Sequence, residues 1–415
     1  MDYLEKYGIK PYINAHDTIT LYGASRMAEN TKEAMNQISR CFVDIQDLQI
    51  RLGKHIAEVT HNEAAYLANG AAGAVQLCAA VCMVNGSSYH YMHLPDTTGL
   101  KQEFLVFSCQ HNCYDKAIEA AGGTIRCIGD ADETLAFDLE GAINERTAAV
   151  VYFPSVKYKW GSLSLEETVE IAHQNGVPVI VDAAAQLPPI ENLWKFTGAG
   201  ADLVVFSGGK TLCGPQTSGL IVGKEAMIRD CIRFGSPMHG ICRGSKTSRE
   251  SMIGLCVAID NYMEADQEAM TRSQNRIVDR LVEAMEKLEA FQPFIVHEGP
   301  VGQTYRRAFG QMACVADVEF VAAKMRERGI YIGTDHRYPA IYFSPLNLTQ
   351  EECGEVIRRL NEVGELMEAE KAAGIERARK TSMAEKTVTA GETAAVSASG
   401  ESDWKTIEKR KLGRN

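Results

Sequence analysis

One lysine in this 415-residue chain follows two glycines and an apolar run that is typical of a buried strand. In this position its amine could take part in catalysis. The segment runs from Asp202 to Thr211 and contains Gly208-Gly209-Lys210. Paired glycines allow a backbone to approach a ligand closely. The end of the segment also matches the tail of a nucleotide-binding P-loop, but that pattern requires a glycine where this chain has Val204, inside the apolar run. The P-loop interpretation is therefore excluded.

The other use for such a lysine is as an amine nucleophile that forms a Schiff base with a carbonyl cofactor. The ordinary pKa of a lysine is about 10.4, so the amine must be desolvated or lie near other cations to act at neutral pH. Pyridoxal phosphate additionally requires an acid for its pyridine nitrogen, a cradle for its phosphate and a group packed on its ring. The sequence offers a candidate for each.

The candidate acid is Asp182, which directly follows the apolar run from Val177 to Val181. Ligands bind at the carboxyl ends of strands in open α/β sheets. A carboxylate there would keep the pyridine nitrogen protonated, so that the ring could store electrons. The alternative is that Asp182 only caps the following helix.

The candidate phosphate cradle is formed by Gly70, Ala71, Ala72 and Gly73, which open an Ala-rich helical stretch. Small residues at a helix N-terminus expose backbone N–H groups at the positive end of the helix dipole. They could instead only permit close helix packing. Ser207, three residues before the lysine, could also donate to the phosphate, or be an ordinary turn residue.

Two further residues could contact the ring of the cofactor. His111 follows the run from Phe104 to Phe107, and its planar imidazole could lie over the ring and relay a proton. Its alternative role is that of a loop histidine bonded to backbone. Gln186 could reach the ring hydroxyl, or serve as a turn or cap residue.

The elements that position these residues form an alternating pattern between about residues 60 and 225. Continuous apolar runs are typical of strands buried on both faces, and amphipathic stretches such as Leu165 to Asn175, followed by Gly176, are typical of helices. This alternation predicts an α/β fold with a mostly parallel sheet. The predicted strands are Phe104 to Phe107, Ala148 to Phe153, Val177 to Val181, Leu203 to Phe206 and Gly219 to Val222.

A second pattern begins near residue 250 and predicts a smaller α+β domain. Ser251 to Leu288 consists mainly of helix formers, strand-like pieces follow at Gln311 to Val315 and Ile341 to Phe343, and helical stretches begin near Val318 and Thr349. We expect an N-terminal segment over 1–60 that joins the small domain or an interface, a large cofactor domain over 61–250, a small domain over 251–370 and a flexible tail over 371–415.

The composition excludes several classes of protein. A hydrophobic content of 45% and a net charge of −11 are ordinary for a globular protein and disfavour nucleic acid as a partner. Neither an export signal nor a membrane-spanning segment is recognisable. The 12 cysteines lack regular paired spacing, which indicates a reducing compartment and no structural metal. These features predict a cytoplasmic enzyme.

Several segments together resemble the selenocysteine synthase-like branch of fold-type I pyridoxal phosphate enzymes, and within it the D-glucosaminate-6-phosphate ammonia-lyase group. The resemblance extends over roughly residues 8 to 365. It implies a large cofactor domain, a small domain built from both chain ends, and a homodimer or larger homo-oligomer with active sites at the interfaces. The segments are Pro11 to Ala15, Arg40 to Leu48, Val181 to Gln186 and Phe206 to Gly223.

Residue by residue, the resemblance implies a Schiff base on Lys210, a pyridinium partner at Asp182 and a stacking residue at His111. It also implies a phosphate site near Gly70 to Gly73 and Ser207. The stretch from Arg243 to Thr247 matches a basic segment of the family that approaches the active site of its own or a neighbouring subunit; its alternative role is that of a solvated charged turn.

The chain departs from the family pattern in two places. The family commonly has Asn-Ala-Thr-Gly-Thr where this chain has Asn14-Ala15-His16-Asp17-Thr18, so His16 and Asp17 could alter substrate contacts, or be only polar loop residues. The tRNA-specific members carry an additional N-terminal domain, whereas the motif here begins at Pro11. We therefore do not expect a tRNA substrate.

The expected reaction is an α,β-elimination that releases ammonia from a polar amino acid, including a phosphorylated sugar-derived one, with Lys210 as general base. The alternatives are an aminotransferase or a racemase with the same cofactor, and a non-catalytic regulator that binds the cofactor or a metabolite. Candidates for contact with the substrate are Arg26, Arg243, Lys246 and Arg337, together with His16 and Asp17.

Overall fold

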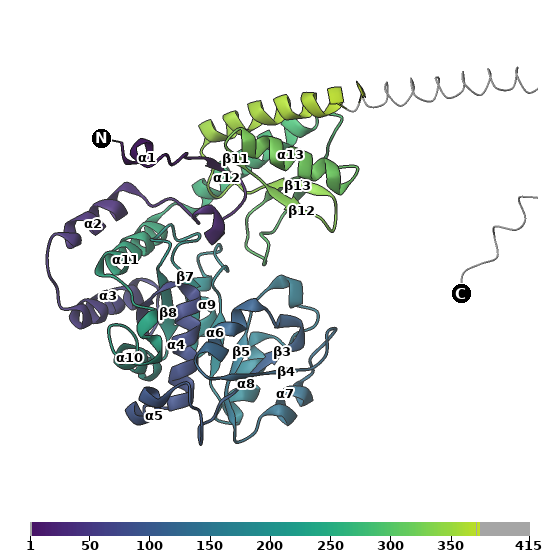
Figure 1. Ribbon diagram of the computed structural model, residues 1–415. Helices are drawn as coiled ribbons and strands as arrows, with labels where there is room; N and C mark the ends of the chain where they lie inside the picture. The colour runs from purple at the N-terminus through teal and green to yellow at the C-terminus, as the bar shows by residue number, and fades with distance from the viewer. Residues whose placement is uncertain (1, 371, 374–415) are drawn as a thin grey trace, which may run out of the picture.

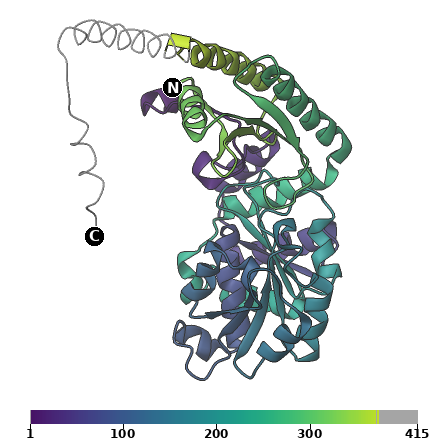
Figure 2. The ribbon, with the colours of Figure 1, turned by 90° about the vertical axis from the view of Figure 1, so that its right-hand side faces the viewer.

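The computed structural model describes residues 2–370 and 372–373, and Figures 1 and 2 show two lobes joined by several segments of the chain. The predicted tail over 371–415 lies outside the described residues, apart from 372–373. None of the helices in the described part is long and apolar enough to span a bilayer.

The larger lobe is built on a seven-stranded sheet with the order β2-β8-β7-β6-β5-β3-β4 within the described residues. The pairs from β7 through β6, β5 and β3 to β4 are parallel, and β8 runs antiparallel to both of its neighbours. The strands are β2 (Ala64–Ala68), β3 (Glu103–Phe107), β4 (Thr124–Ile128), β5 (Thr147–Tyr152), β6 (Val179–Asp182), β7 (Leu203–Ser207) and β8 (Gly219–Gly223).

Apolar residues on both faces of this sheet explain why its strands are continuous hydrophobic runs. In β7, Val204 and Phe206 pack into one core cluster, whereas Leu203 and Val205 pack into the other. One face is covered by α3 (Ile45–Val59), α7 (Ala136–Ala142), α8 (Leu165–Gln174), α9 (Asn192–Gly198) and α11 (Arg249–Glu264). The other is covered by α4 (Gly70–Val84), α5 (Ser88–His93), α6 (Lys116–Ala120) and α10 (Glu225–Phe234).

The smaller lobe contains a four-stranded antiparallel sheet with the order β12-β13-β10-β9. Its helices, which share a third core cluster, include α12, α13 and a helix over 350–370. The elements are α12 (Gln267–Met285), β9 (Gln292–Val296), β10 (Arg307–Gln311), α13 (Val315–Glu327), β12 (Gly333–Asp335) and β13 (Ala340–Phe343).

The N-terminal segment contacts both lobes. Its strand β1 (Ile13–Asn14) pairs in parallel with β11 (Ile330–Tyr331) of the smaller lobe, and α1 (Tyr3–Lys6) precedes it. Its helix α2 (Glu29–Ser39) packs against α11. Because α11 belongs to the core of the large sheet, we propose that the boundary between the domains lies after α11 and not near residue 250.

One local prediction is wrong. The strand expected at Gln311 to Val315 lies earlier, in β10, because Val315 already begins α13. The helix formers between Ser251 and Leu288 form two helices, α11 and α12, and Asp266 caps the second by accepting a hydrogen bond from the Ala269 N–H at 2.8 Å.

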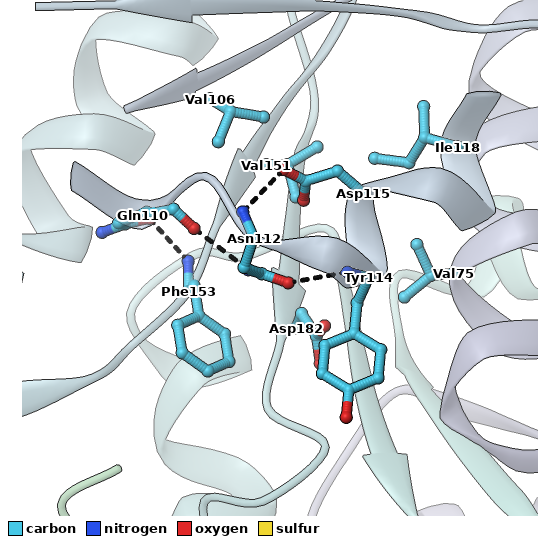
Figure 3. A pocket seen from close by; sticks show the side chains of 10 residues that line it. All are labelled: Val75, Val106, Gln110, Asn112, Tyr114, Asp115, Ile118, Val151, Phe153 and Asp182. Carbon is cyan, nitrogen blue, oxygen red and sulfur yellow. Dashed lines mark hydrogen bonds between the residues drawn. The ribbon is translucent and has the colours of Figure 1, made fainter. Parts of the chain in front are cut away.

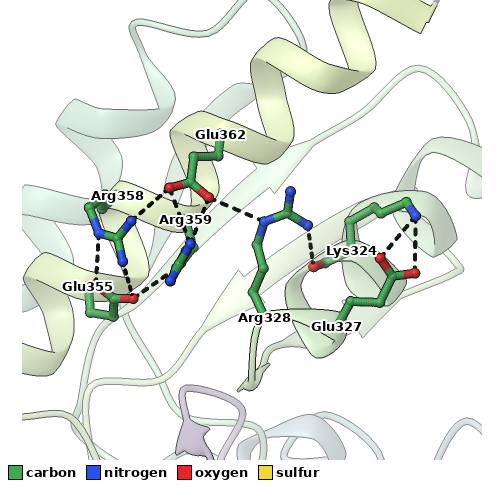
Figure 4. A network of polar contacts seen from close by, with 7 residues as sticks. All are labelled: Lys324, Glu327, Arg328, Glu355, Arg358, Arg359 and Glu362. Atoms are coloured by element: carbon green, nitrogen blue, oxygen red, sulfur yellow. Dashed lines mark hydrogen bonds and ion pairs between the residues drawn. The ribbon is translucent and has the colours of Figure 1, made fainter.

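An ion-pair network joins the helix over 350–370 to the end of α13 (Figure 4). Glu362, in the helix over 350–370, accepts from Arg328 just after α13 at 3.3 Å and from Arg358 at 2.8 Å. Exposed ion pairs contribute little to stability, so the apolar side of this helix, with Val356 and Leu360 fully buried, holds it in place. The network residues are Lys324, Glu327, Arg328, Glu355, Arg358, Arg359 and Glu362.

Candidate active site

Lys210 and Asp182 lie at the carboxyl ends of adjacent parallel strands. Asp182 is the last residue of β6 and is in register with Val205 of β7, and Lys210 lies in the turn that follows β7. The turn is closed by the Cys213 N–H, which donates to the Lys210 carbonyl at 2.9 Å. A Cβ at Gly209 would lie 2.6 Å from the Cα of Gln216, so the turn is too close to neighbouring backbone for a side chain there.

Burial shifts the pKa values of Lys210 and Asp182 in opposite directions. Burial lowers the pKa of Lys210, and the charges of Asp182 and Asp17 oppose that shift. Burial also raises the pKa of Asp182, although the Ala184 N–H bond at 3.0 Å and the charge of Lys210 oppose it. Each group is therefore held closer to neutrality than in water, and a cation beside Asp182 would favour its ionised form.

The N-terminus of α4 is open to an anion. Its N-cap, Asn69, makes no side-chain capping bond and instead donates through Nδ2 to the Lys246 carbonyl at 2.8 Å. No acidic side chain lies in the first turn, so the N–H groups between Gly70 and Gly73 keep their positive potential. The neighbouring Gly219 passes so close that its Cβ would lie 2.5 Å from the Gly70 carbonyl carbon.

The basic segment from Arg243 to Thr247 lies beside this helix end. A Cβ at Gly73 would lie 3.3 Å from the Ser245 Oγ, and that hydroxyl donates to Gln76 at 3.4 Å. The side chains of Arg243 and Lys246 are exposed. The structure thus brings together the predicted cradle and the predicted basic segment.

His111 is oriented by a carboxylate at the end of β3. Its Nδ1 lies 2.6 Å from Asp115 Oδ2, which also accepts from the Asn112 N–H at 3.0 Å. Asn112 and Asp115 line a small cavity that Asp182 also lines, shown in Figure 3. The His111 imidazole is held at Nδ1 by Asp115, and its side chain is 54% exposed.

Ser207 and Gln186 have different surroundings. Ser207 ends β7, three residues from Lys210, and is half-buried. Gln186 is buried, and its amide donates to the Val301 carbonyl at 3.3 Å, so it links the loop after β6 to the smaller lobe. Its side chain is therefore already engaged in a contact between the lobes.

His16 and Asp17 come from the N-terminal loop and lie between the lobes. Asp17 is buried, accepts from the Tyr305 hydroxyl at 3.1 Å and is close enough to Lys210 to raise its pKa. The His16 ring contacts Tyr342 with a centroid distance of 5.3 Å, and burial lowers the pKa of His16. The loop that departs from the family pattern thus borders the Lys210 site.

Two of the four basic residues predicted to bind the substrate, Arg26 and Arg337, form ion pairs with carboxylates of the protein itself. Arg26 forms a two-pronged ion pair with Glu352 at 2.7 and 2.8 Å, which links the N-terminal segment to the helix over 350–370. Arg337 pairs with Asp335 at 3.1 Å but stays largely exposed. The ion pair with Glu352 therefore gives Arg26 a structural role rather than a role in binding the substrate.

Arg307, at the start of β10, is a buried arginine that is not among the residues predicted from the sequence. Its neighbour Arg306 turns to Asp279 at 2.7 Å, whereas Arg307 is 8% exposed and has no carboxylate partner among the described residues. Its guanidinium lies 5.1 Å from the Phe309 ring centroid and 5.3 Å from that of Tyr342. A charged residue beginning a buried strand was the available signal.

One cluster of metal-ligand type lies apart from this site, in the described part of the chain. His55 of α3 lies 2.7 Å from Asp260 of α11, and Cys256 lies beside them, with ligand atoms within 4.8 Å of one another. The His55–Asp260 pair satisfies both of its members without an ion. We assign no metal to it.

Comparisons with known proteins agree with this architecture. Residues 114–290 match the family described as L-seryl-tRNA selenium transferase. D-glucosaminate-6-phosphate ammonia lyase of Salmonella typhimurium is 28% identical over 372 residues, which is 87% of this chain and 97% of that protein. A 5'-C-glycyluridine monooxygenase-decarboxylase of a Streptomyces species is 27% identical and covers 88% of this chain and 92% of its own length.

Comparison with solved structures identifies the same fold. A structure of D-glucosaminate-6-phosphate ammonia-lyase superposes with a TM-score of 0.76 at 27% identity, covering 88% of this chain and 98% of its own. Serine palmitoyltransferase of Sphingomonas wittichii shares the fold, with a TM-score of 0.57, 13% identity, and coverage of 87% of this chain and 89% of its own. The chain therefore has the fold-type I architecture of pyridoxal phosphate enzymes. Both the predicted fold class and the resemblance to the selenocysteine synthase-like branch are confirmed.

Proposed function

We propose that this chain is a pyridoxal phosphate-dependent ammonia-lyase that acts on a polar amino acid with a leaving group on its β-carbon. The observation that carries the proposal is the meeting of Lys210 and Asp182 at adjacent strand ends beside the open N-terminus of α4. The similarity to an ammonia lyase along nearly the whole chain supports the reaction class.

The side chains fit the cofactor. Lys210 would hold its aldehyde carbon, Asp182 its protonated ring nitrogen, and the first turn of α4 with Ser207 its phosphate. His111, oriented by Asp115, would pack on the ring. Gln186 would contact the ring hydroxyl only if it gave up its bond to Val301.

When bound, the cofactor supplies an electron sink next to the substrate α-carbon. The Lys210 amine, whose pKa is lowered by burial, would take the α-proton as general base. Asp182, ionised by the adjacent positive ring nitrogen, would keep that nitrogen protonated while the β-substituent leaves. Hydrolysis of the released product then gives a keto acid and ammonia.

The test is a screen of D- and L-amino acids and amino sugar acids, with and without phosphate, using the cofactor-loaded protein. We expect equal amounts of ammonia and keto acid, without an added keto acid and without oxygen uptake. Dependence on a keto acid would identify an aminotransferase, and retention of the β-substituent a racemase. Oxygen uptake with CO₂ release would instead favour chemistry of the kind named for the Streptomyces relative.

We also propose a homodimer or larger homo-oligomer in the cytoplasm. Apolar side chains of the N-terminal region are left in solvent, with Leu21 80% and Phe42 98% exposed, which suits burial by a second copy. The 12 cysteines are free, as expected in a reducing compartment.

Sedimentation velocity should give at least twice the monomer mass, and Phe42→Asp should shift the measured mass toward that of the monomer. A monomeric wild-type protein would contradict the proposal.

A further inference from the structure

A cleft of about 530 Å³ lies at the edge of the large sheet opposite to the Lys210 site. Ala148 at the start of β5 and Pro178 just before β6 line it, whereas Asp182 ends β6. The last turn of α4, from Val81 to Val84, forms one side. Since this helix has 15 residues and is therefore roughly 22 Å long, the cleft is well separated from the phosphate cradle at the other end of the helix. The volume is within the range of small-molecule sites, roughly 300–1,000 Å³.

One end of the cleft, beside α10, carries negative charge. Asp230 of α10 is half-buried, and a Cβ at Gly86, just after α4, would lie 3.6 Å from the Asp230 Oδ2. No basic side chain lies in the last turn of α4, so the carbonyl groups at the C-terminus of this helix add to the negative potential. Asp230 itself forms no hydrogen bond or ion pair with the residues that the structure describes.

The two arginines of α10 bind other groups. Arg229 pairs with Glu225 at 3.1 Å, and Arg233 donates to the Gly86 carbonyl at 2.9 Å. Burial raises the pKa of Asp230, and the charges of Arg233 and Arg229 oppose that shift. The Asp230 carboxylate is therefore left to attract a cationic group of a ligand in the cleft.

A lysine lies at the other end of the cleft. Lys101 lies just before β3, whereas α10 packs against β2 and β8. Because β7, β6 and β5 separate β8 from β3 in the sheet, Lys101 and Asp230 approach the cleft from different sides. Lys101 is exposed and pairs with no carboxylate of the described chain. The apolar part of the lining includes Val81, Val84, Leu100, Ala148, Pro178 and Met227, and its other polar members include Asn85, Ser87 and His90.

We propose that this cleft binds a linear zwitterion, with an ammonium group at Asp230, an apolar chain along the lining and a carboxylate at Lys101. An ω-amino acid or a short apolar peptide has this arrangement, because its two charges lie at opposite ends of the molecule. An α-amino acid carries both charges on one carbon and satisfies only one end of the cleft. The site is separate from the one at Lys210 and does not depend on the reaction that takes place there.

Binding is measured by calorimetry on the cofactor-loaded protein after borohydride reduction, so that an added amine cannot react with the cofactor. The probe is 6-aminohexanoate, and its isomer 2-aminohexanoate has both charges on one carbon. Hexylamine and hexanoate each lack one of the two charges. We expect 6-aminohexanoate to bind at least about 10-fold more tightly than any of these three, because it alone makes a charge-assisted contact at both ends.

Two variants test the two ends separately. Asp230→Asn should weaken the binding of 6-aminohexanoate and of hexylamine at least about 10-fold and leave that of hexanoate unchanged. Lys101→Gln should weaken 6-aminohexanoate and hexanoate only about 3-fold, because Lys101 is exposed, and leave hexylamine unchanged. Glu140→Gln is the control, since it removes a negative charge from an exposed position on α7, which covers the other face of the sheet.

The pattern across the probes decides between a ligand contact and a structural effect. Equal binding of the two isomers to the wild type would overturn the proposal. Equal losses for all the probes in Asp230→Asn, or a loss in Glu140→Gln as large as that in Asp230→Asn, would overturn it as well. Losses that follow the charge of the probe would support it, even if the protein released no ammonia from any amino acid.

Discussion

Lys210→Ala is expected to abolish turnover and the visible absorption of the bound cofactor together. The amine would both hold the cofactor and move the α-proton, and general-base transfer alone contributes ~10²–10⁴-fold, so activity should fall by at least about 1,000-fold. Absorbance spectra and the ammonia assay measure the two effects. Lys195→Ala provides a matched control, because Lys195 is exposed on α9, which packs against β7.

The same variant has a second expected effect, on the cofactor-free protein. Because the pKa of Lys210 in the folded protein is lowered from its ordinary value, the unfolded state binds more protons in the pH range just below that value. The contribution of Lys210 to stability therefore rises with pH through this range. Denaturant titrations at several pH values should show a shallower rise for Lys210→Ala; an unchanged slope would mean that the amine is solvated in the folded protein.

Asp182→Asn is expected to lower kcat by at least about 100-fold while the cofactor stays bound. The amide cannot carry the negative charge that keeps the ring nitrogen protonated, and removal of one such electrostatic contact costs ~10²–10³-fold in kcat. Lys210 and the first turn of α4 remain, so the visible absorption should persist with an altered maximum. Activity within a few-fold of wild type would show that Asp182 does not act on the ring nitrogen of the cofactor.

Asp202→Asn is the matched control for this variant. Asp202 lies just before β7, at the opposite end of the strand from the site, where it pairs with Lys224 at 2.9 Å and His173 at 2.8 Å. We expect this substitution to lower the thermal stability because it breaks buried contacts, and to leave kcat of the folded enzyme unchanged.

The sequence was sufficient to predict where Asp182 and Lys210 lie relative to their own strands. Continuous apolar runs identify strands buried on both faces, and a polar residue that follows such a run lies at the end of the strand. That these two strands are neighbours in the sheet is seen only in the structure. The glycines at 208 and 209 predict close approach of the backbone to a ligand. In the structure both positions lie against the protein's own atoms, Gly208 against Ser218 and Gly209 against Gln216, and a Cβ would not fit at either.

The substrate side could not be predicted in this way, because it depends on how the small sheet lies against the large one. Arg26 pairs with Glu352, 326 residues further along the chain, whereas Arg307 lines a cleft and forms no ion pair with a carboxylate among the described residues. No feature of the neighbouring sequence distinguishes these two arginines. The boundary error at β10 has a different cause, since a five-residue strand followed closely by a helix leaves only a short pattern to interpret.

The most direct test of the account is chemical trapping of the cofactor. Borohydride reduction of the cofactor-loaded protein, followed by proteolysis and mass spectrometry, should find the phosphopyridoxyl group on Lys210 alone. A group attached to another lysine, such as Lys157, or a protein that binds no pyridoxal phosphate, would contradict the central claim.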